Sequence, residues 1–380
     1  MPLGALEDPP EALRRYVDMT RGRLVRFGEA GLLDSVRTAY VGGGTPSVLE
    51  SLLPELVAAI RSWCPVEELT CEANPESFGS GLASALRSAG ATRVSFGVQS
   101  LDDGELAGIG RLHTAEEALS AIEQALGAGL AVSADLMCGL PGQTEASWER
   151  SVAGVIASGA GHVSVYPLTL EEGTPLEMAS RLDPSIIPDE DFQAWCMERS
   201  ESLLSDAGFK RYEVASYARP GRACRHNIAY WTGASYLGIG RSSAGMFPGS
   251  SVSAVRELLP GAPDVGGGGD PRLSDRYSCG RVRAVQLDGE AASFDFELLS
   301  PREAVAEDLM LAMRMKRGID RGLLRQAAIA IGSDALRSAI DRAVEAGLAR
   351  RDETAGSLVP TERGWLMGNE LFGMMWDLAR

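Results

Sequence analysis

Three side chains that could bind a polar ligand stand where short β-prone runs end: Glu72, Gln99 and Asp135. A fourth, Arg111, comes from the loop that follows Gln99. Two carboxylates, an amide and a guanidinium suit a ligand that carries an amine, hydroxyl groups and a carboxylate, such as a nucleoside joined to an amino acid. Each group could alone cap a loop, but four on one rim favour a binding site.

A glycine-rich loop, Gly42-Gly43-Gly44-Thr45, follows the first β-prone run. Glycines let backbone amides approach a ligand without a Cβ in the way, and Thr45 adds a hydroxyl. No lysine follows as in a Walker A loop, and the order differs from the G-x-G-x-x-G of a dinucleotide turn. Taken alone, the loop is better explained as a tight turn than as a ligand cradle.

The elements that would position these residues alternate between strand and helix. Segments whose apolar residues recur at helical spacing lie between the β-prone runs, and successive runs begin about one β-plus-α unit apart. This pattern predicts an α/β fold, a parallel sheet or partial (β/α) barrel whose site lies at the carboxyl ends of the strands. The expected strands are Thr38 to Val41, Glu68 to Cys71, Arg93 to Val98, Leu130 to Leu136 and His162 to Tyr166.

Three regions follow from changes in this pattern. We expect the barrel in residues 1–208 and a mixed α/β region in 209–300, with β-prone runs at Tyr212 to Tyr217 and Ala234 to Ile239. Residues 301–380 contain helical segments and the hairpin candidate Ala349 to Val359, which predict a winged-helix-like domain. Such a domain can be a packing module, and DNA binding is the weaker interpretation.

Composition excludes several classes of function. Among 380 residues, 36 basic and 52 acidic side chains give a net charge of −16, which disfavours binding to nucleic acid or anionic lipid. No apolar stretch approaches 18 residues, so no membrane span is expected. The six cysteines form no short pair and no signal-peptide pattern precedes them, which favours a reduced, cytoplasmic location.

An ordered series of motifs resembles a known family. The chain is similar to the radical S-adenosylmethionine family of oxygen-independent coproporphyrinogen III oxidases and, more closely, to their HemW-type heme chaperone relatives, from about residue 10 to the C-terminus. The matching motifs are the Gly-Gly-Gly-Thr-Pro loop, Glu72 to Glu76, Arg93 to Ser100, Gly110 to His113, Asp135 to Gln143, Tyr212 to Val214 and His226 to Trp231.

The resemblance implies roles for particular residues. Gly43, Gly44 and Thr45 would hold the amino-acid end of S-adenosylmethionine, and the four rim residues would lie around the rest of that cofactor. His226, in a His-Asn-x-x-Tyr element, is the family's candidate heme contact and possible heme iron ligand, and Tyr230 offers a flat face to the macrocycle. The alternative is that His226 only joins two parts of the chain by hydrogen bonds.

The family's C-x-x-x-C-x-x-C motif, which holds a 4Fe-4S cluster, does not occur in this sequence. No trio of the six cysteines replaces it, so the cluster ligands are absent from this chain. We expect the motif, together with a first barrel strand, in an N-terminally extended form of the protein. A gene start placed too far downstream is favoured over a natural loss of the motif. Whether Cys224 assists in iron ligation stays open.

These observations together predict a heme chaperone-like radical SAM protein that binds heme and delivers it to an acceptor protein. Two alternatives remain: an oxygen-independent coproporphyrinogen III oxidase, which decarboxylates its substrate in porphyrin biosynthesis, and a cluster-free, non-catalytic heme-binding protein. No catalytic residue is assigned.

Overall fold

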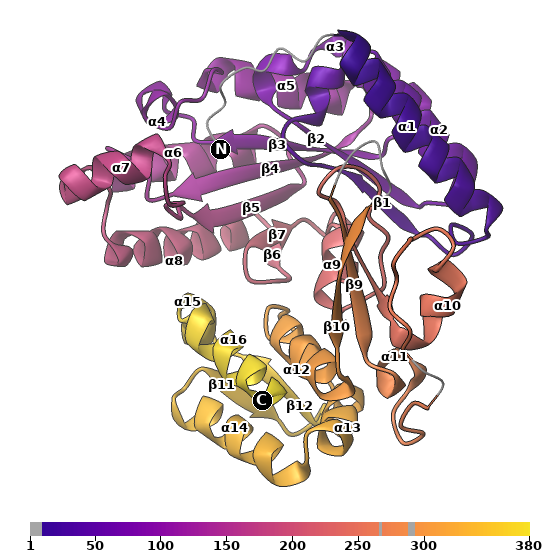
Figure 1. Ribbon diagram of the computed structural model, residues 1–380. Helices are drawn as coiled ribbons and strands as arrows, with labels where there is room; N and C mark the ends of the chain where they lie inside the picture. The colour runs from indigo at the N-terminus through magenta and orange to yellow at the C-terminus, as the bar shows by residue number, and fades with distance from the viewer. Residues whose placement is uncertain (1–9, 266–267, 288–292) are drawn as a thin grey trace. The chain divides into compact units, whose positions relative to one another are not determined.

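The computed structural model describes residues 10–265, 268–287 and 293–380 (Figure 1). The chain forms two compact units. Unit 1 comprises the described residues up to Val17 together with Gly31–His226, and unit 2 comprises Asp18–Ala30 together with Asn227–Arg380. The first helix, α1 (Pro10–Glu29), and α9 (Arg225–Trp231) therefore contribute residues to both units.

Unit 1 is built on a seven-stranded sheet in the order β1-β2-β3-β4-β5-β7-β6. Strands β1 to β5 pair in parallel, whereas β7 pairs antiparallel with both β5 and β6. The strands are β1 (Thr38–Val41), β2 (Glu68–Ala73), β3 (Arg93–Gln99), β4 (Ala131–Cys138), β5 (His162–Pro167), β6 (Lys210–Arg211) and β7 (Ser216–Ala218).

Helices connect the parallel strands, and α5, α6 and α8 pack along one side of the sheet (Figure 1). Their starts are fixed locally: Thr114 and Thr144 form capping boxes at α5 and α6. The helices of unit 1 are α2 (Leu52–Trp63), α3 (Ser80–Ala89), α4 (Asp103–Gly108), α5 (Ala115–Gly127), α6 (Glu145–Ala157), α7 (Pro175–Leu182) and α8 (Glu190–Asp206), with short 3-10 helices η1 (Pro46–Leu49), η2 (Pro75–Ser77) and η3 (Pro184–Ile186).

The two faces of this sheet differ in chemistry because successive side chains of a strand point to opposite faces. One face is apolar and buried, and in β3 it presents Val94, Phe96 and Val98. The other face is polar along every parallel strand, so the polar side chains of the candidate site lie on the inner face of the curved sheet. Its residues are Thr38, Tyr40, Glu68, Thr70, Glu72, Arg93, Ser95, Gly97, Gln99, Ser133, Asp135, His162, Ser164 and Tyr166.

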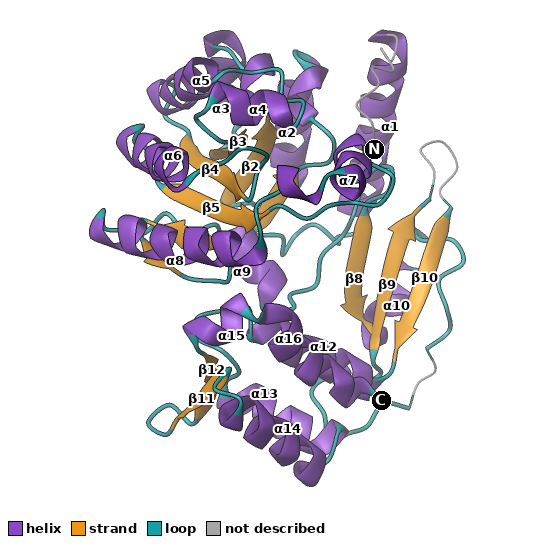
Figure 2. Ribbon diagram, turned by 90° about the vertical axis from the view of Figure 1, so that its left-hand side faces the viewer, coloured by secondary structure: helices purple, strands orange, loops and turns teal. Residues whose placement is uncertain are grey.

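Unit 2 contains an antiparallel sheet in the order β10-β9-β8, drawn in orange in Figure 2, and a helical part that ends in the hairpin β11–β12. Buried Arg281 pairs with Glu307 at 2.5 Å and with Asp308 at 2.9 Å, which joins β9 to α12. The elements are β8 (Ala244–Pro248), η4 (Gly249–Ser251), α10 (Val252–Val255), α11 (Asp275–Ser278), β9 (Arg281–Gln286), β10 (Phe294–Leu299), α12 (Pro301–Ala312), α13 (Arg321–Ala330), α14 (Ser333–Glu345), β11 (Ala349–Asp352), β12 (Ser357–Pro360), α15 (Glu362–Leu366), α16 (Gly368–Trp376) and η5 (Asp377–Ala379).

The predicted fold class is confirmed: a partial parallel α/β barrel is followed by three helices and a hairpin in winged-helix-like order. The strand predicted at Ala234 to Ile239 is wrong, because only an isolated bridge from Tyr236 to Met246 forms there. The boundary between the two units, after His226, falls inside the expected mixed region 209–300. Among the described helices, none is long and apolar enough to cross a bilayer.

Candidate functional site

Glu72 and Asp135 lie on the polar face of unit 1 near the carboxyl ends of β2 and β4. Strand register places Glu72 beside Ser95, and the Ser95 hydroxyl donates to Asp135 Oδ2 at 3.3 Å. Burial raises the pKa of Asp135 to about 6, hydrogen bonds from Ser164 and Ser95 oppose the rise, and the charge of Glu72 adds to it. The two predicted carboxylates therefore share one polar surface.

Glu72 is held by the first loop of the barrel. Its Oε1 accepts from the Tyr40 hydroxyl at 2.7 Å, and its Oε2 accepts from the Gly43 backbone N–H at 3.1 Å. A Cβ at Gly42 would lie 2.7 Å from the Tyr40 ring, so glycine is needed for this close approach. Gly43 thus binds Glu72 directly, whereas a Cβ at Gly43 or Gly44 would meet nothing within 4 Å.

Asn74 joins three loops around the site. Its Oδ1 accepts from Arg111 Nη1 at 3.3 Å, and its amide nitrogen donates to Thr45 Oγ1 at 3.2 Å and to Glu76 Oε1 at 3.2 Å. One side chain therefore sets the positions of two predicted site residues, Arg111 and Thr45. Asn74 was not among the predicted site residues, and its side chain makes no capping hydrogen bond to the short helix that follows it.

His113 anchors the loop that carries Arg111. Its ring nitrogens lie 3.2 Å from Glu76 Oε2 and 3.2 Å from the Val98 carbonyl oxygen, and the residue is only 3 % exposed. Because a carbonyl oxygen can only accept, Nε2 donates to Val98 in this arrangement. The histidine thereby ties the Arg111 loop to β3 and to the Asn74 loop.

Gln99 ends β3 in the left-handed region, with φ of 65°. A Cβ at Gly97 would lie 3.1 Å from Gln99 Nε2 and 3.6 Å from Arg111 Nη2, so a glycine makes room for both polar groups. Gln99 is 8 % exposed, and its Oε1 has no hydrogen-bond partner among the described residues. A bound donor would account for this unsatisfied acceptor.

This set of polar side chains fits S-adenosylmethionine, because the ammonium and ribose hydroxyls of that cofactor need hydrogen-bond acceptors and its carboxylate needs a cation. It does not fit a 4Fe-4S cluster. The six cysteines are free thiols, five of them buried, and within the described ranges no group of three or more His, Cys, Asp or Glu side chains is arranged to hold a metal ion. No redox step is therefore assigned to this chain.

His226 binds the first two strands of the barrel. Its Nδ1 lies 3.1 Å from Thr38 Oγ1, its ring stacks on Tyr40 with centroids 5.1 Å apart, and its backbone N–H donates to Glu68 Oε1 at 3.0 Å. Burial lowers the pKa of His226 and the charge of Glu68 opposes the change, so the ring is neutral near pH 7. These bonds give His226 a structural role, which does not itself test heme contact.

A buried ion pair supports that arrangement. Arg93 Nη2 lies 3.3 Å from Glu68 Oε2, and the guanidinium also donates to Ser133 Oγ and to the carbonyls of Arg222 and Ala223. The Cys224 thiol donates to Glu68 Oε1 at 3.4 Å. The segment that leads into His226 is therefore fixed to β2 and β3.

Tyr230 belongs to unit 2 and is 39 % exposed. It stacks on Tyr236 at 4.6 Å, and its hydroxyl donates to the Tyr236 hydroxyl at 3.0 Å. Part of Tyr230, the residue predicted to contact the macrocycle, is therefore accessible, and Tyr236 restrains the orientation of its ring.

Comparisons with known proteins agree on one family. Residues 8–153 match the model of the radical SAM superfamily. The heme chaperone HemW of Escherichia coli is 32% identical over 343 residues, which cover 88% of this chain and 83% of that protein. HemW of Mycobacterium tuberculosis is 40% identical over 216 residues, but the match covers 56% of this chain and only 55% of that relative.

A solved structure shows the same fold. Coproporphyrinogen III oxidase (HemN) from Escherichia coli superposes with a TM-score of 0.72 at 17% sequence identity, covering 97% of this chain and 84% of that one. At this identity the likeness concerns the fold alone.

Proposed function

Because the chain belongs to the HemW family of radical SAM proteins, we propose that it binds heme and delivers it to an acceptor protein. The observation that carries the proposal is the match to the Escherichia coli heme chaperone along 88% of this chain. Radical SAM membership also implies S-adenosylmethionine and a 4Fe-4S cluster as family cofactors. The free thiols fit the cytoplasmic location that we propose for the chain.

His226 is the residue we assign to heme iron. Neutral imidazole is a common axial ligand, and the chain has three histidines. His113 and His162 are 3 % and 1 % exposed, and both rings are held inside unit 1. His226 is half-buried, so it is the most exposed of the three histidines. Tyr230 is proposed as a separate contact to the macrocycle.

Glu72, Gln99, Arg111 and Asp135 are the residues that would surround S-adenosylmethionine, with Gly43, Gly44 and Thr45 at its amino-acid end. When bound, the cofactor supplies a sulfonium group and an adenosine. Tyr40 keeps the Glu72 carboxylate oriented, and burial beside Glu72 raises the Tyr40 pKa, so its hydroxyl remains a donor at neutral pH. Asn74 holds Arg111 and Thr45 in place.

The test is heme binding followed by transfer, on the full chain. Ferric heme is titrated into the protein, and the Soret band is expected to shift and saturate at one heme per chain. The loaded protein is then mixed with apo-hemoproteins of the same organism at increasing concentration. Delivery predicts a transfer rate that rises with acceptor concentration, because transfer occurs in a complex of the two proteins.

Two results would contradict the proposal. A Soret change that never saturates would show non-specific adsorption of heme. A transfer rate that is independent of acceptor concentration for every acceptor would show passive release. The second result, with saturable binding intact, would leave the non-catalytic heme-binding alternative.

A further inference from the structure

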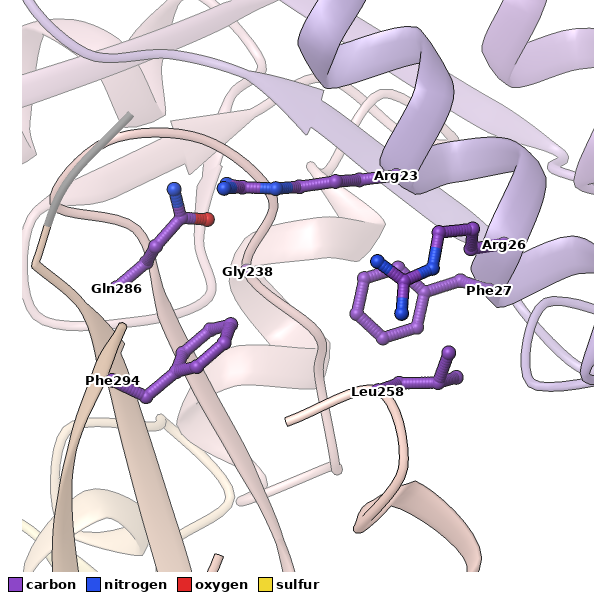
Figure 3. A pocket seen from close by; sticks show the side chains of 7 residues that line it. All are labelled: Arg23, Arg26, Phe27, Gly238, Leu258, Gln286 and Phe294. Carbon is purple, nitrogen blue, oxygen red and sulfur yellow. The ribbon is translucent and has the colours of Figure 1, made fainter. Parts of the chain in front are cut away.

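A small hollow in unit 2 has room for a water molecule but not for a ligand. Helix α1 supplies Arg23, Arg26 and Phe27 to its lining (Figure 3). Its volume is about 10 Å³, close to the smallest space that holds one water. Unit 1, by contrast, contains a tyrosine that touches a residue of each proposed ligand site.

That tyrosine is Tyr40, at the end of β1. Its hydroxyl donates to Glu72 Oε1 at 2.7 Å. Its ring stacks on the ring of His226, with centroids 5.1 Å apart and 23° between the planes. Glu72 belongs to the proposed S-adenosylmethionine site, and His226 is the residue assigned to heme iron. A single side chain therefore connects residues that would hold the two ligands.

The direction of the His226 ring is set by two residues of β1. Thr38 and Tyr40 are alternate residues of that strand, so they point to the same face of the sheet. Thr38 Oγ1 lies 3.1 Å from His226 Nδ1. When Nδ1 carries the ring proton it donates to Thr38, which leaves Nε2 as the nitrogen that can bind iron. Thr38 holds one edge of the imidazole and Tyr40 covers one face, so together they orient Nε2.

Glu72 is fixed by the loop that would hold the amino-acid end of the cofactor. Its two oxygens each accept one hydrogen bond, from the Tyr40 hydroxyl and from the Gly43 backbone N–H at 3.1 Å. A carboxylate oxygen can accept a second bond, so a donor of the cofactor can be added without displacing Tyr40. A Cβ at Gly42 would lie 2.7 Å from the Tyr40 ring and 3.1 Å from the Glu72 carboxyl carbon, so the packing leaves little room for either side chain to move.

We propose that Tyr40 couples the two ligand sites, so that S-adenosylmethionine at Glu72 and heme at His226 each bind more tightly when the other is present. Both ligand assignments come from the proposed function, on which this coupling rests. A ligand that immobilises Glu72 also restrains Tyr40 and the His226 ring, so the second ligand meets side chains that have already lost rotational freedom. The effect is the same in both directions, and we expect about fivefold, at the lower end of coupling between two sites.

The first test needs no heme. The full chain is labelled with ¹⁵N at histidine, and the His226 signals are identified by their loss in His226→Gln. They are expected to shift as S-adenosylmethionine is added to saturation, which calorimetry on the same sample establishes. The shift should be largely lost in Tyr40→Phe, because this variant keeps the stacked ring and removes only the hydroxyl that reaches Glu72.

The second test measures the coupling itself. Ferric heme is titrated with and without saturating S-adenosylmethionine, and S-adenosylmethionine with and without heme. Each affinity should rise about fivefold in the unmodified chain and less than about twofold in Tyr40→Phe. Tyr212→Phe is the matched control, because it removes a hydroxyl that lies 2.8 Å from a different histidine, His162, and it should keep the full coupling.

Three results would overturn the proposal: no binding of S-adenosylmethionine, heme affinity that is unchanged or lower in its presence, or full coupling in Tyr40→Phe. A heme titration that never saturates would instead count against the proposed function. The ¹⁵N signals would then still show whether the cofactor acts on His226 through Tyr40, so the two failures are distinguishable.

Discussion

Arg93→Met is the substitution that best probes how the barrel holds His226. Arg93 is 4 % exposed and Glu68 is 7 % exposed, so the variant leaves a carboxylate buried without its cation. It also removes donors from the Arg222 and Ala223 carbonyls, at 2.9 and 3.3 Å. Breaking a buried pair from one side costs about 3–5 kcal/mol. We therefore expect unit 1 to lose that much stability.

The double variant Glu68→Leu, Arg93→Met separates charge from packing. With both charges removed, the buried carboxylate no longer lacks a partner, and about 1–3 kcal/mol of the loss should return. Recovery should be incomplete because Glu68 also accepts from the His226 backbone N–H and the Cys224 thiol. Ser133→Ala is a control that removes one hydrogen bond to Arg93 without exposing a charge.

The assay is amide hydrogen exchange read by mass spectrometry, because it reports on β2 to β5 separately from unit 2. Faster exchange is expected in β2, β3 and the segment before His226 in Arg93→Met, with partial restoration in the double variant. A cost of less than about 1 kcal/mol for Arg93→Met, or a double variant less stable than the single one, would refute the reasoning.

Three further predictions concern the site and its pH dependence. Asn74→Ala should weaken S-adenosylmethionine binding about tenfold in calorimetry, because Arg111 and Thr45 lose a shared partner, whereas Ser62→Ala, which removes an exposed hydrogen bond on α2, should not; equal affinities would contradict the Asn74 role. The pKa of Asp135 is raised to about 6, so the folded state binds the proton more tightly than the unfolded state, and the contribution of Asp135 to stability should fall as the pH rises from about 4 to 6. The free energy of unfolding, measured in urea at several pH values, should lose this fall in Asp135→Asn; the same pH dependence in the variant would refute the prediction. Burial, with the nearby Arg93 charge, lowers the pKa of His162 to about 3, so the unfolded state takes up the proton and stability should rise from about pH 3 to 6.5; His162→Gln should flatten that rise, and an unchanged profile would contradict it.

Much of unit 1 could be predicted because its strands alternate regularly with helices. All five parallel strands begin within one residue of the predicted positions, and Glu72, Gln99, Arg111 and Asp135 come to the same end of the sheet. The rule that parallel strands present their carboxyl ends together needs no tertiary information.

The supporting residues were missed although a signal was present. Thr38 and Tyr40, like Glu68, Thr70 and Glu72, are polar side chains at alternate strand positions, and that period marks a polar face inside the sheet. Reading only the strand ends left Tyr40 out of the site. These partners of Glu68 could not be found this way, because Cys224 and His226 reach it across more than 150 residues.

The error at Ala234 to Ile239 has a local cause. The segment has β-prone side chains, but a Cβ at Gly238 would lie 2.3 Å from the Ala244 carbonyl oxygen, and Gly233 and Gly240 have positive φ. The backbone therefore turns closely against β8, and only Tyr236 pairs with it. Propensity alone does not reveal such a close approach of two backbone segments.

The heme assignment is tested most directly by the absorption and electron paramagnetic resonance spectra of the ferric heme complex in three proteins: the unmodified chain, His226→Ala and Thr38→Val. Thr38→Val removes the hydroxyl 3.1 Å from His226 Nδ1 but keeps the imidazole, so it is the matched control. Imidazole-ligated spectra are predicted for the unmodified chain and Thr38→Val, and their loss is predicted for His226→Ala. Identical spectra for all three proteins would contradict heme binding through His226.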